Sequence, residues 1–330
     1  MKTTETPTPA RRRSPIFWVP TAYFGMGLPF VVLNMVAVLM YKGLGVSDAK
    51  IAFWTSLIML PWTLKPLWSP LLEMYRTKKF FVVLTQMVSG VTFGLIALSL
   101  HLPSFFAITI ALFAIVAFSG ATHDVACDGV YMDELNAQEQ AKYIGWQGAF
   151  YNVAKIIGTG LLVYLAGFLK DEYEGPAEDA VLYSWTVIMI VLGGVMFALG
   201  LYHTRMLPSG KHAHSVTSFS QSMAELWNVI RNFFTKKHIL YYICFIILYR
   251  LAEGFIMKIA PLFLRASRDV GGLGLSLTEI GTLNGIFGSA AFVLGSLLAG
   301  IYVSKFGLKM TLFTLCCIFN LPFVAYTFLA

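Results

Sequence analysis

Two aspartates stand four residues apart in a long apolar stretch of this 330-residue sequence. If the stretch is helical, Asp124 and Asp128 share one face of the helix, with a rise of about 6 Å between them. Two neighbouring carboxylates in a medium of low dielectric oppose each other's ionisation, which suits one of them to proton exchange. The alternative is a structural latch in which they pair with Lys155 or with basic residues of the loops. Both roles predict side chains that point away from lipid.

Five further ionisable residues lie within apolar stretches, where an uncompensated charge is costly. They are Lys65, Lys155, Arg250, Glu253 and Lys258. We predict that Lys65, Lys155 and Arg250 attract an anionic solute, and that Glu253 joins the two aspartates in proton coupling. Because Arg250 and Glu253 are three residues apart, an intrahelical ion pair is the alternative for both. Lys258 is expected to snorkel toward the membrane surface.

Two aromatic residues, Trp62 and Tyr131, are predicted to bind solute because such rings stack on sugar rings. Anchoring at the membrane interface is the alternative for each of them. None of the four cysteines stands in a metal-ligand spacing, and no nucleophile and base are arranged for catalysis. The sequence therefore predicts no catalytic residue, no metal site and no cofactor.

These residues must be positioned by membrane helices. The sequence is 57% hydrophobic and only 12% charged, against roughly a quarter charged in soluble domains. Its apolar runs are long enough to cross the hydrocarbon core of a bilayer. The sequence therefore predicts an all-α polytopic membrane protein. We expect nine spans, at about residues 16–41, 51–71, 80–100, 105–132, 143–169, 181–203, 239–264, 278–303 and 310–330.

The formal net charge of +7 follows from topology rather than from nucleic-acid binding. Basic residues concentrate before the first span and in every second connection, most of all in residues 205–237. The positive-inside rule then predicts a cytoplasmic N-terminus. The expected partners are the lipid bilayer, protons and a small solute, with no nucleic acid.

An internal repeat relates two parts of the chain. GLGVSDAKI at residues 43–51 returns as GLGLSLTEI at residues 272–280, and Ser276 and Glu279 of the second copy have capping-box spacing. The repeat predicts two homologous six-helix halves, of which the second is incomplete by three spans. We therefore expect this sequence to be part of a twelve-span protein. Glycines at close-packing spacing, Gly281 and Gly285, are predicted to lie at helix contacts.

The expected domains follow from the repeat and from one long connection. That connection carries apolar residues every three or four positions, which predicts an amphipathic helix on the cytoplasmic surface. The divisions are a cytoplasmic tail at 1–15, a six-helix half at 16–203, a linker at 204–238 and a partial second half at 239–330.

Repeated six-helix halves joined by a long cytoplasmic connection describe the major facilitator superfamily, whose halves rock about a site near the membrane midplane. Within it, the sequence resembles the AmpG-type muropeptide permeases. The resemblance rests on FGMGLP from Phe24, LKPLWSPLLEMY from Leu64, HDVACD from His123 and ILYRLAEGF from Ile247. It implies import of anhydro-muropeptides, sugar and peptide fragments of the cell wall, across a bacterial inner membrane by coupling to the proton gradient.

The resemblance also bears on individual positions. The family has like-charged groups at Lys65, Asp124, Asp128, Lys155, Arg250 and Glu253. It usually has glutamine where this sequence has His123, and a base where it has Tyr131. If that base contacts a solute carboxylate, a different or less anionic glycoside is expected here.

Other functions remain open at this stage. A carrier of the same superfamily could move another glycoside, an oligosaccharide or an organic anion. The remaining alternatives are a sensor that does not transport and a membrane-embedded transferase.

Overall fold

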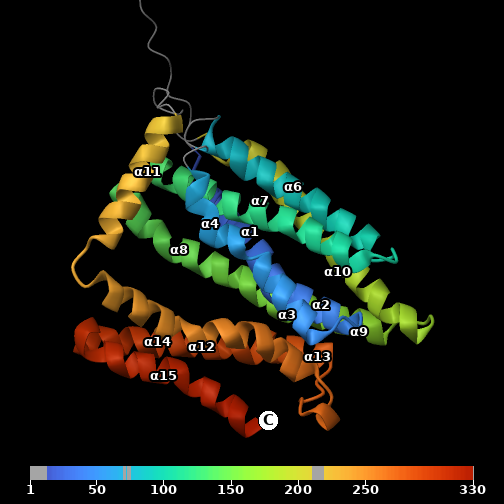
Figure 1. The fold of residues 1–330 in the computed structure, drawn as a ribbon. Helices are drawn as coiled ribbons and strands as arrows, with labels where there is room; N and C mark the ends of the chain where they lie inside the picture. The colour runs from blue at the N-terminus through green and yellow to red at the C-terminus, as the bar shows by residue number, and fades with distance from the viewer. Residues whose placement is uncertain (1–12, 70–71, 73–75, 210–218, 330) are drawn as a thin grey trace, which may run out of the picture.

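The computed structural model describes residues 13–69, 72, 76–209 and 219–329, and these residues form helices without a strand. Figure 1 shows long helices gathered in one bundle, with the helices of residues 239–329 along one side of it. This confirms the predicted fold class, an all-helical membrane protein.

Six helices of the described residues are long and apolar enough to cross a membrane. They are Pro15–Gly43, Lys78–Ser99, Phe105–Glu134, Ala137–Asp171, Asp179–Met206 and Ile239–Arg265. They match six of the nine predicted spans. The second, eighth and ninth predicted spans are helical too, but they are interrupted or shorter as apolar helices.

The first span forms the core of the bundle. It is one continuous helix made of α1 (Val19–Val31), the π-helical η2 (Val32–Val36) and α2 (Ala37–Gly43). Nearly all of its side chains from Val31 to Tyr41 are buried. Pro29, inside α1, lacks an amide hydrogen, and the widened turn of η2 follows it.

The second span, predicted at residues 51–71, is a broken helix. Its parts are α3 (Asp48–Leu57), α4 (Leu60–Leu64) and the 3-10 turn η3 (Lys65–Leu67). Pro61 has no amide hydrogen to give to the carbonyl of Leu57, so the helix stops there. The break turns α4 and η3 toward the fourth span, which they contact.

In the first half, the long helix α6 (Lys78–Ser99) packs against two others, α7 (Phe105–Glu134) and α10 (Ala177–Met206). The fifth span lies on the other side of α1. It comprises α8 (Ala137–Ile156), the π-helical η4 (Ile157–Leu162) and α9 (Val163–Asp171). Asn136 and Glu139 start α8 with a capping box, which satisfies backbone N–H groups at its first turn.

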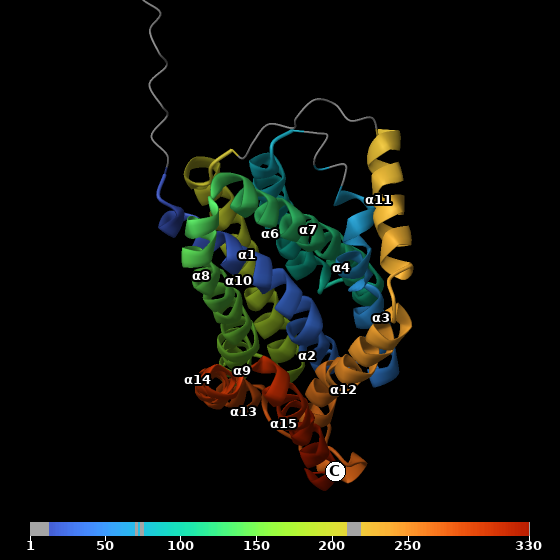
Figure 2. The same ribbon diagram turned by 90° about the vertical axis from the view of Figure 1, so that its left-hand side faces the viewer.

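The second half follows a separate helix, α11 (Phe219–Phe234), which lies at the edge of the bundle in Figures 1 and 2. This is the amphipathic helix expected in the linker, and its place on a membrane surface stays a prediction. The later elements are α12 (Ile239–Arg265), α13 (Leu277–Thr282), the π-helical η6 (Leu283–Gly288), α14 (Ser289–Phe306) and α15 (Leu308–Leu329). The capping box of Ser276 with Glu279 is confirmed.

The two halves meet where α9 and η4 pack on α13 and η6, a contact that we call the seam. Glycines allow the helix backbones to approach closely there. A Cβ on Gly160 would collide with the backbone of Gly285, and one on Gly281 with the backbone of Tyr164. The predicted role of Gly281 and Gly285 in helix contacts is confirmed.

A glycine of α6 gives a direct test of helix packing. A Cβ on Gly90 would lie 2.8 Å from the backbone nitrogen of Phe197 and 2.9 Å from the carbonyl oxygen of Gly193, whereas nothing lies within 4 Å of one on Gly94. Both replacements by alanine gain the same helix propensity, so their difference isolates packing. We expect Gly90→Ala to unfold at a lower temperature than Gly94→Ala, with overpacking costing about 1–3 kcal/mol. Thermal melting of the purified protein in detergent measures this, and equal melting temperatures would contradict the close α6–α10 contact.

Candidate functional site

The Asp124 carboxylate, on α7, is held by two side chains from the second span. Its Oδ2 accepts a hydrogen bond of 3.0 Å from the indole nitrogen of Trp62 and lies 3.7 Å from the Lys65 ammonium. The Asp124 side chain is only 12% exposed, and that of Lys65 is 36% exposed. Within the described part of the chain, Oδ1 of Asp124 is buried without a hydrogen-bond partner. The carboxylate is therefore compensated on one oxygen and able to accept a hydrogen bond on the other.

A glycine one helical turn before Asp124 leaves space for the Trp62 ring. A Cβ on Gly120 would lie 2.7 Å from Cζ2 of the indole and 2.9 Å from Cη2, so only glycine leaves room for the ring. Phe30 of α1 meets the same indole edge to face, with ring centres 5.5 Å apart. The indole is thus fixed between α1 and α7 with its N–H directed at Asp124.

Asp128 is held from the first span rather than the second. The Tyr23 hydroxyl donates a hydrogen bond of 2.7 Å to Oδ1 of Asp128. The Tyr23 ring also meets Tyr131 edge to face, and the Tyr131 hydroxyl donates to the backbone oxygen of Gln140 at 2.6 Å. Both ends of Tyr131 therefore make protein contacts in this structure, and its binding of solute stays a prediction.

Lys155 lies on α8, across from these residues. Its ammonium is 5.1 Å from the ring centre of Tyr151, a cation–π contact, and that ring lies 6.5 Å from Phe30. Phe30 thus links the surroundings of Lys155 to those of Trp62. No ion pair joins Lys155 to either aspartate of α7 among the residues described, so the latch with Lys155 is not formed here.

The predicted residues of the seventh span lie on α12, in the second half. Glu253 is partly buried, and the side chain of Arg250 lies outside what the structure describes. The prediction that Lys258 snorkels is wrong. Its ammonium donates a hydrogen bond of 3.1 Å to the backbone oxygen of Thr55 on α3, because an unfilled carbonyl lies within its reach.

A second carboxylate of α7 repeats the construction found at Asp124. The Lys78 ammonium lies 3.0 Å from Oδ2 of Asp133, joining α6 to α7. The aliphatic part of Lys78 runs over Gly129, where a Cβ would lie 2.5 Å from the lysine Cδ. At both places a glycine four residues before the aspartate makes room for the side chain that compensates it.

A buried polar chain near the aspartates was missed by the sequence analysis. Thr21 lies 2.9 Å from Nε2 of His203, whose Nδ1 lies 2.7 Å from Oε1 of Gln86. Nε2 of Gln86 in turn lies 3.0 Å from Nε2 of His123. The four residues tie α1, α10, α6 and α7 together. A search for charged groups passes over such a chain, because glutamine and threonine carry no charge and the histidines are far apart in sequence.

No group of three or more His, Cys, Asp or Glu residues that could hold a metal ion occurs among the described residues.

The sequence profile of the Major Facilitator Superfamily matches residues 21–330. The chain belongs to this superfamily. This chain has the same fold as a bacterial homologue of the human lysosomal transporter Spinster. The crystal structure of that homologue is in an inward-facing and unoccupied conformation. It superposes with a TM-score of 0.66 at 15% identity, covering 92% of this chain and 64% of the other. Membership in a superfamily of transporters favours transport over enzymatic catalysis, as the sequence predicted.

Two proteins within reach of sequence comparison are similar to most of this chain. The chain is 24% identical over 270 residues to the anhydromuropeptide permease of Escherichia coli strain K12, covering 79% of this chain and 50% of the relative. A Rickettsia conorii protein whose name includes "transporter AmpG 4" is 21% identical over 295 residues, covering 85% of this chain and 66% of that protein. The chain thus spans about half to two thirds of the length of these relatives.

Substitution of two tryptophans tests whether Asp124 is charged. Trp62 donates to the Asp124 carboxylate and Trp68 donates at 3.2 Å to the neutral Thr122 hydroxyl, and both are partly buried. Hydrogen bonds to charged groups contribute about 1.5–3 kcal/mol, and neutral ones about 0.5–1.5 kcal/mol. We expect Trp62→Phe to lower the melting temperature more than Trp68→Phe, as measured on the purified protein. An equal or reversed order would contradict a charged Asp124 held by Trp62.

Proposed function

We propose that the chain is part of a proton-coupled secondary transporter that imports a sugar-containing solute, an anhydro-muropeptide used in cell-wall recycling. The observation that carries the proposal is the sheltered pair of Asp124 and Lys65, which brings a proton acceptor beside an anion-attracting group. The name of the Escherichia coli relative supports the choice of solute. Family membership supports a small solute and a multi-pass membrane protein.

The pair offers a physical route to coupling. While Asp124 is ionised, it neutralises Lys65 at 3.7 Å. A proton on Asp124 removes that negative charge and leaves the ammonium to attract an anionic group of the solute, an attraction that is strong in a medium of low dielectric. Binding of the proton and binding of the anion then favour each other, which is the thermodynamic condition for symport.

Within this proposal the predicted residues keep their separate roles. Asp124, Asp128 and Glu253 handle protons, whereas Lys65, Lys155 and Arg250 attract anionic groups of the solute. Trp62 and Tyr131 are proposed to contact its sugar rings. The partly buried rings of Phe30 and Tyr151 connect Trp62 to Lys155 by successive contacts.

The proposed setting is the bacterial inner membrane, with the N-terminus in the cytoplasm. The division into a tail, a six-helix half, a linker and a partial second half is retained as part of the proposal. The concentration of basic residues on one side of the spans supports this orientation.

Uptake by cells that express the full protein tests the proposal. We expect uptake of labelled anhydro-muropeptide that is abolished by a protonophore, and we expect Asp124→Asn to reduce it at least tenfold because asparagine cannot exchange the proton. Asp48→Asn is the matched control, since Asp48 pairs with Lys42 at 2.6 Å near the end of the second span and is 47% exposed.

Three outcomes would contradict parts of the proposal. Uptake of a labelled neutral sugar alone would retain a carrier and replace the solute. Uptake that persists with the protonophore would remove proton coupling. Binding of the muropeptide without uptake would instead indicate a sensor.

A further inference from the structure

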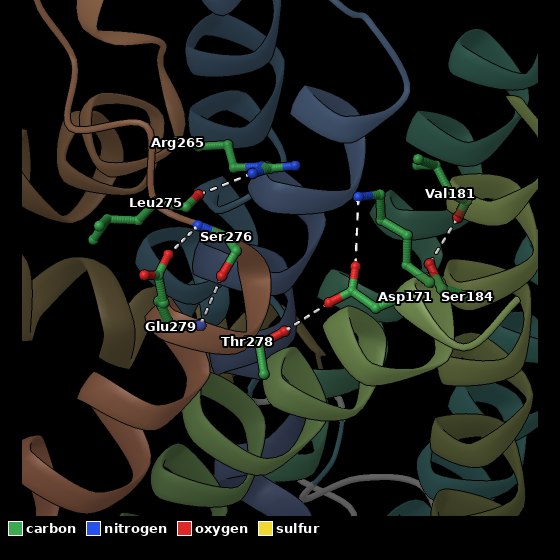
Figure 3. Close-up of polar contacts among 9 residues, drawn as sticks. Asp171, Val181, Ser184, Arg265, Leu275, Ser276, Thr278 and Glu279 are labelled. Carbon is green, nitrogen blue, oxygen red and sulfur yellow. Dashed lines mark hydrogen bonds and ion pairs between the residues drawn. The ribbon is translucent and has the colours of Figure 1, made fainter. Parts of the chain in front are cut away.

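The seam is closed by close backbone contacts and by a hydrogen bond between side chains. Figure 3 shows the Thr278 hydroxyl, at the start of α13, reaching Asp171 at the end of α9, a hydrogen bond of 3.3 Å. The same picture shows how α13 is set in place: Ser276 and Glu279 cap its first turn, and Arg265 donates to the backbone oxygen of Leu275 at 2.9 Å. The contacts of Arg265, Ser276 and Glu279 order the start of α13 within the second half, and the Thr278 hydrogen bond joins it to the first half.

A different tie crosses between the halves beside the seam. Lys258, on α12 of the second half, donates its hydrogen bond of 3.1 Å to the backbone oxygen of Thr55, on α3 of the first half. Thr55 is fully buried and Lys258 is partly buried. In the described part of the chain, no carboxylate lies within ion-pair distance of Lys258. The ammonium is therefore committed to a backbone oxygen rather than to an opposite charge.

That oxygen is available because the second span is broken. In an unbroken helix the amide of Met59 would bond to the carbonyl of Thr55, four residues before it. Here the amide of Met59 bonds instead to the oxygen of Ser56 at 3.2 Å, as the chain leaves α3 ahead of Pro61. The break thus exposes an acceptor on the first half, and Lys258 of the second half fills it.

The surroundings make this hydrogen bond expensive to lose. Lys258 borders a cavity of about 470 Å³ between α3 and α12, whose other lining residues are mostly apolar, among them Leu251, Phe255 and Ile259. A buried backbone carbonyl and a sheltered ammonium are both destabilised when they have no partner. If the halves separate at this end, both groups lose their partner together and must be rehydrated.

We propose that Lys258 is a pin between the two halves, which holds the seam closed by capping the carbonyl freed at the break of the second span. The proposal rests on the carrier function above, because a carrier must open and close at this end as its halves rock. The pin favours the closed arrangement and is released when the seam opens. This lysine therefore acts on the equilibrium between the closed and open arrangements of the two halves rather than on solute binding.

The distance between two spin labels, one on each side of the seam, measures directly how often the halves are closed or open. Cysteines introduced at the exposed positions Glu172, in the first half, and Val270, in the second, carry the labels in the full protein with its native cysteines replaced by serine. We expect Lys258→Met to raise the ratio of long to short distances about tenfold, in line with loss of a hydrogen bond to a charged group. Lys258→Arg, which keeps a donor, is expected to restore the short distances.

Two further variants keep the test decisive. Lys42→Met removes a cation near the same end that pairs with Asp48 of the first half, and it is expected to leave the distances unchanged. Pro61→Ala lets the helix continue, so that Met59 takes the Thr55 carbonyl, and it is expected to lengthen the distances as Lys258→Met does. Unchanged distances in both Lys258→Met and Pro61→Ala would overturn the pin. Because the distances are measured without solute or a proton gradient, this result is separate from failure of the uptake test.

Discussion

The structure around the candidate site depends on holding one carboxylate, that of Asp124, in the buried interior of the helix bundle. An uncompensated carboxylate there would be costly, so neighbouring elements are shaped to supply donors. The break at Pro61 turns α4 and η3 toward α7, which brings Trp62 and Lys65 to the carboxylate. Gly120 then leaves the space that the indole needs. A change in any of these would alter the compensation of the same charge.

The break in the second span serves both halves of the molecule. On one side it supplies Lys65 to Asp124, and on the other it frees the carbonyl of Thr55 that Lys258 fills. The part of the second span before the break thus contacts the second half through Thr55, and the part after the break contributes Lys65 to the candidate site. The π-helical segments η2, η4 and η6 also contact one another in this region, and π turns are frequent at functional positions of helices. Irregular backbone is concentrated where the halves meet.

Much of the fold could be predicted from the sequence, because long apolar runs leave a membrane protein few alternatives to helices. Pro61 marks an interruption of the second span in the sequence, but a proline inside an apolar run can either bend a helix or end it, and the sequence does not state which. The pairing of Lys65 with Asp124 could not be derived, because nothing in the order of residues states how α4 and α7 are rotated toward each other. For Lys258 the sequence predicts that the ammonium reaches the membrane surface. A backbone carbonyl that is free in another span cannot be inferred from the sequence. Gln86 and His203 could not be placed together from the sequence, because they are far apart in the chain and their partners lie on other helices.

The central claim is that a proton on Asp124 and an anionic solute move together. It is tested most directly in sealed vesicles that contain the full purified protein and a pH-sensitive dye, to which anhydro-muropeptide is added without an imposed pH gradient. We predict that solute entry acidifies the vesicle interior, and that Asp124→Asn abolishes this acidification. Solute entry without any change of internal pH in the unaltered protein would contradict the account.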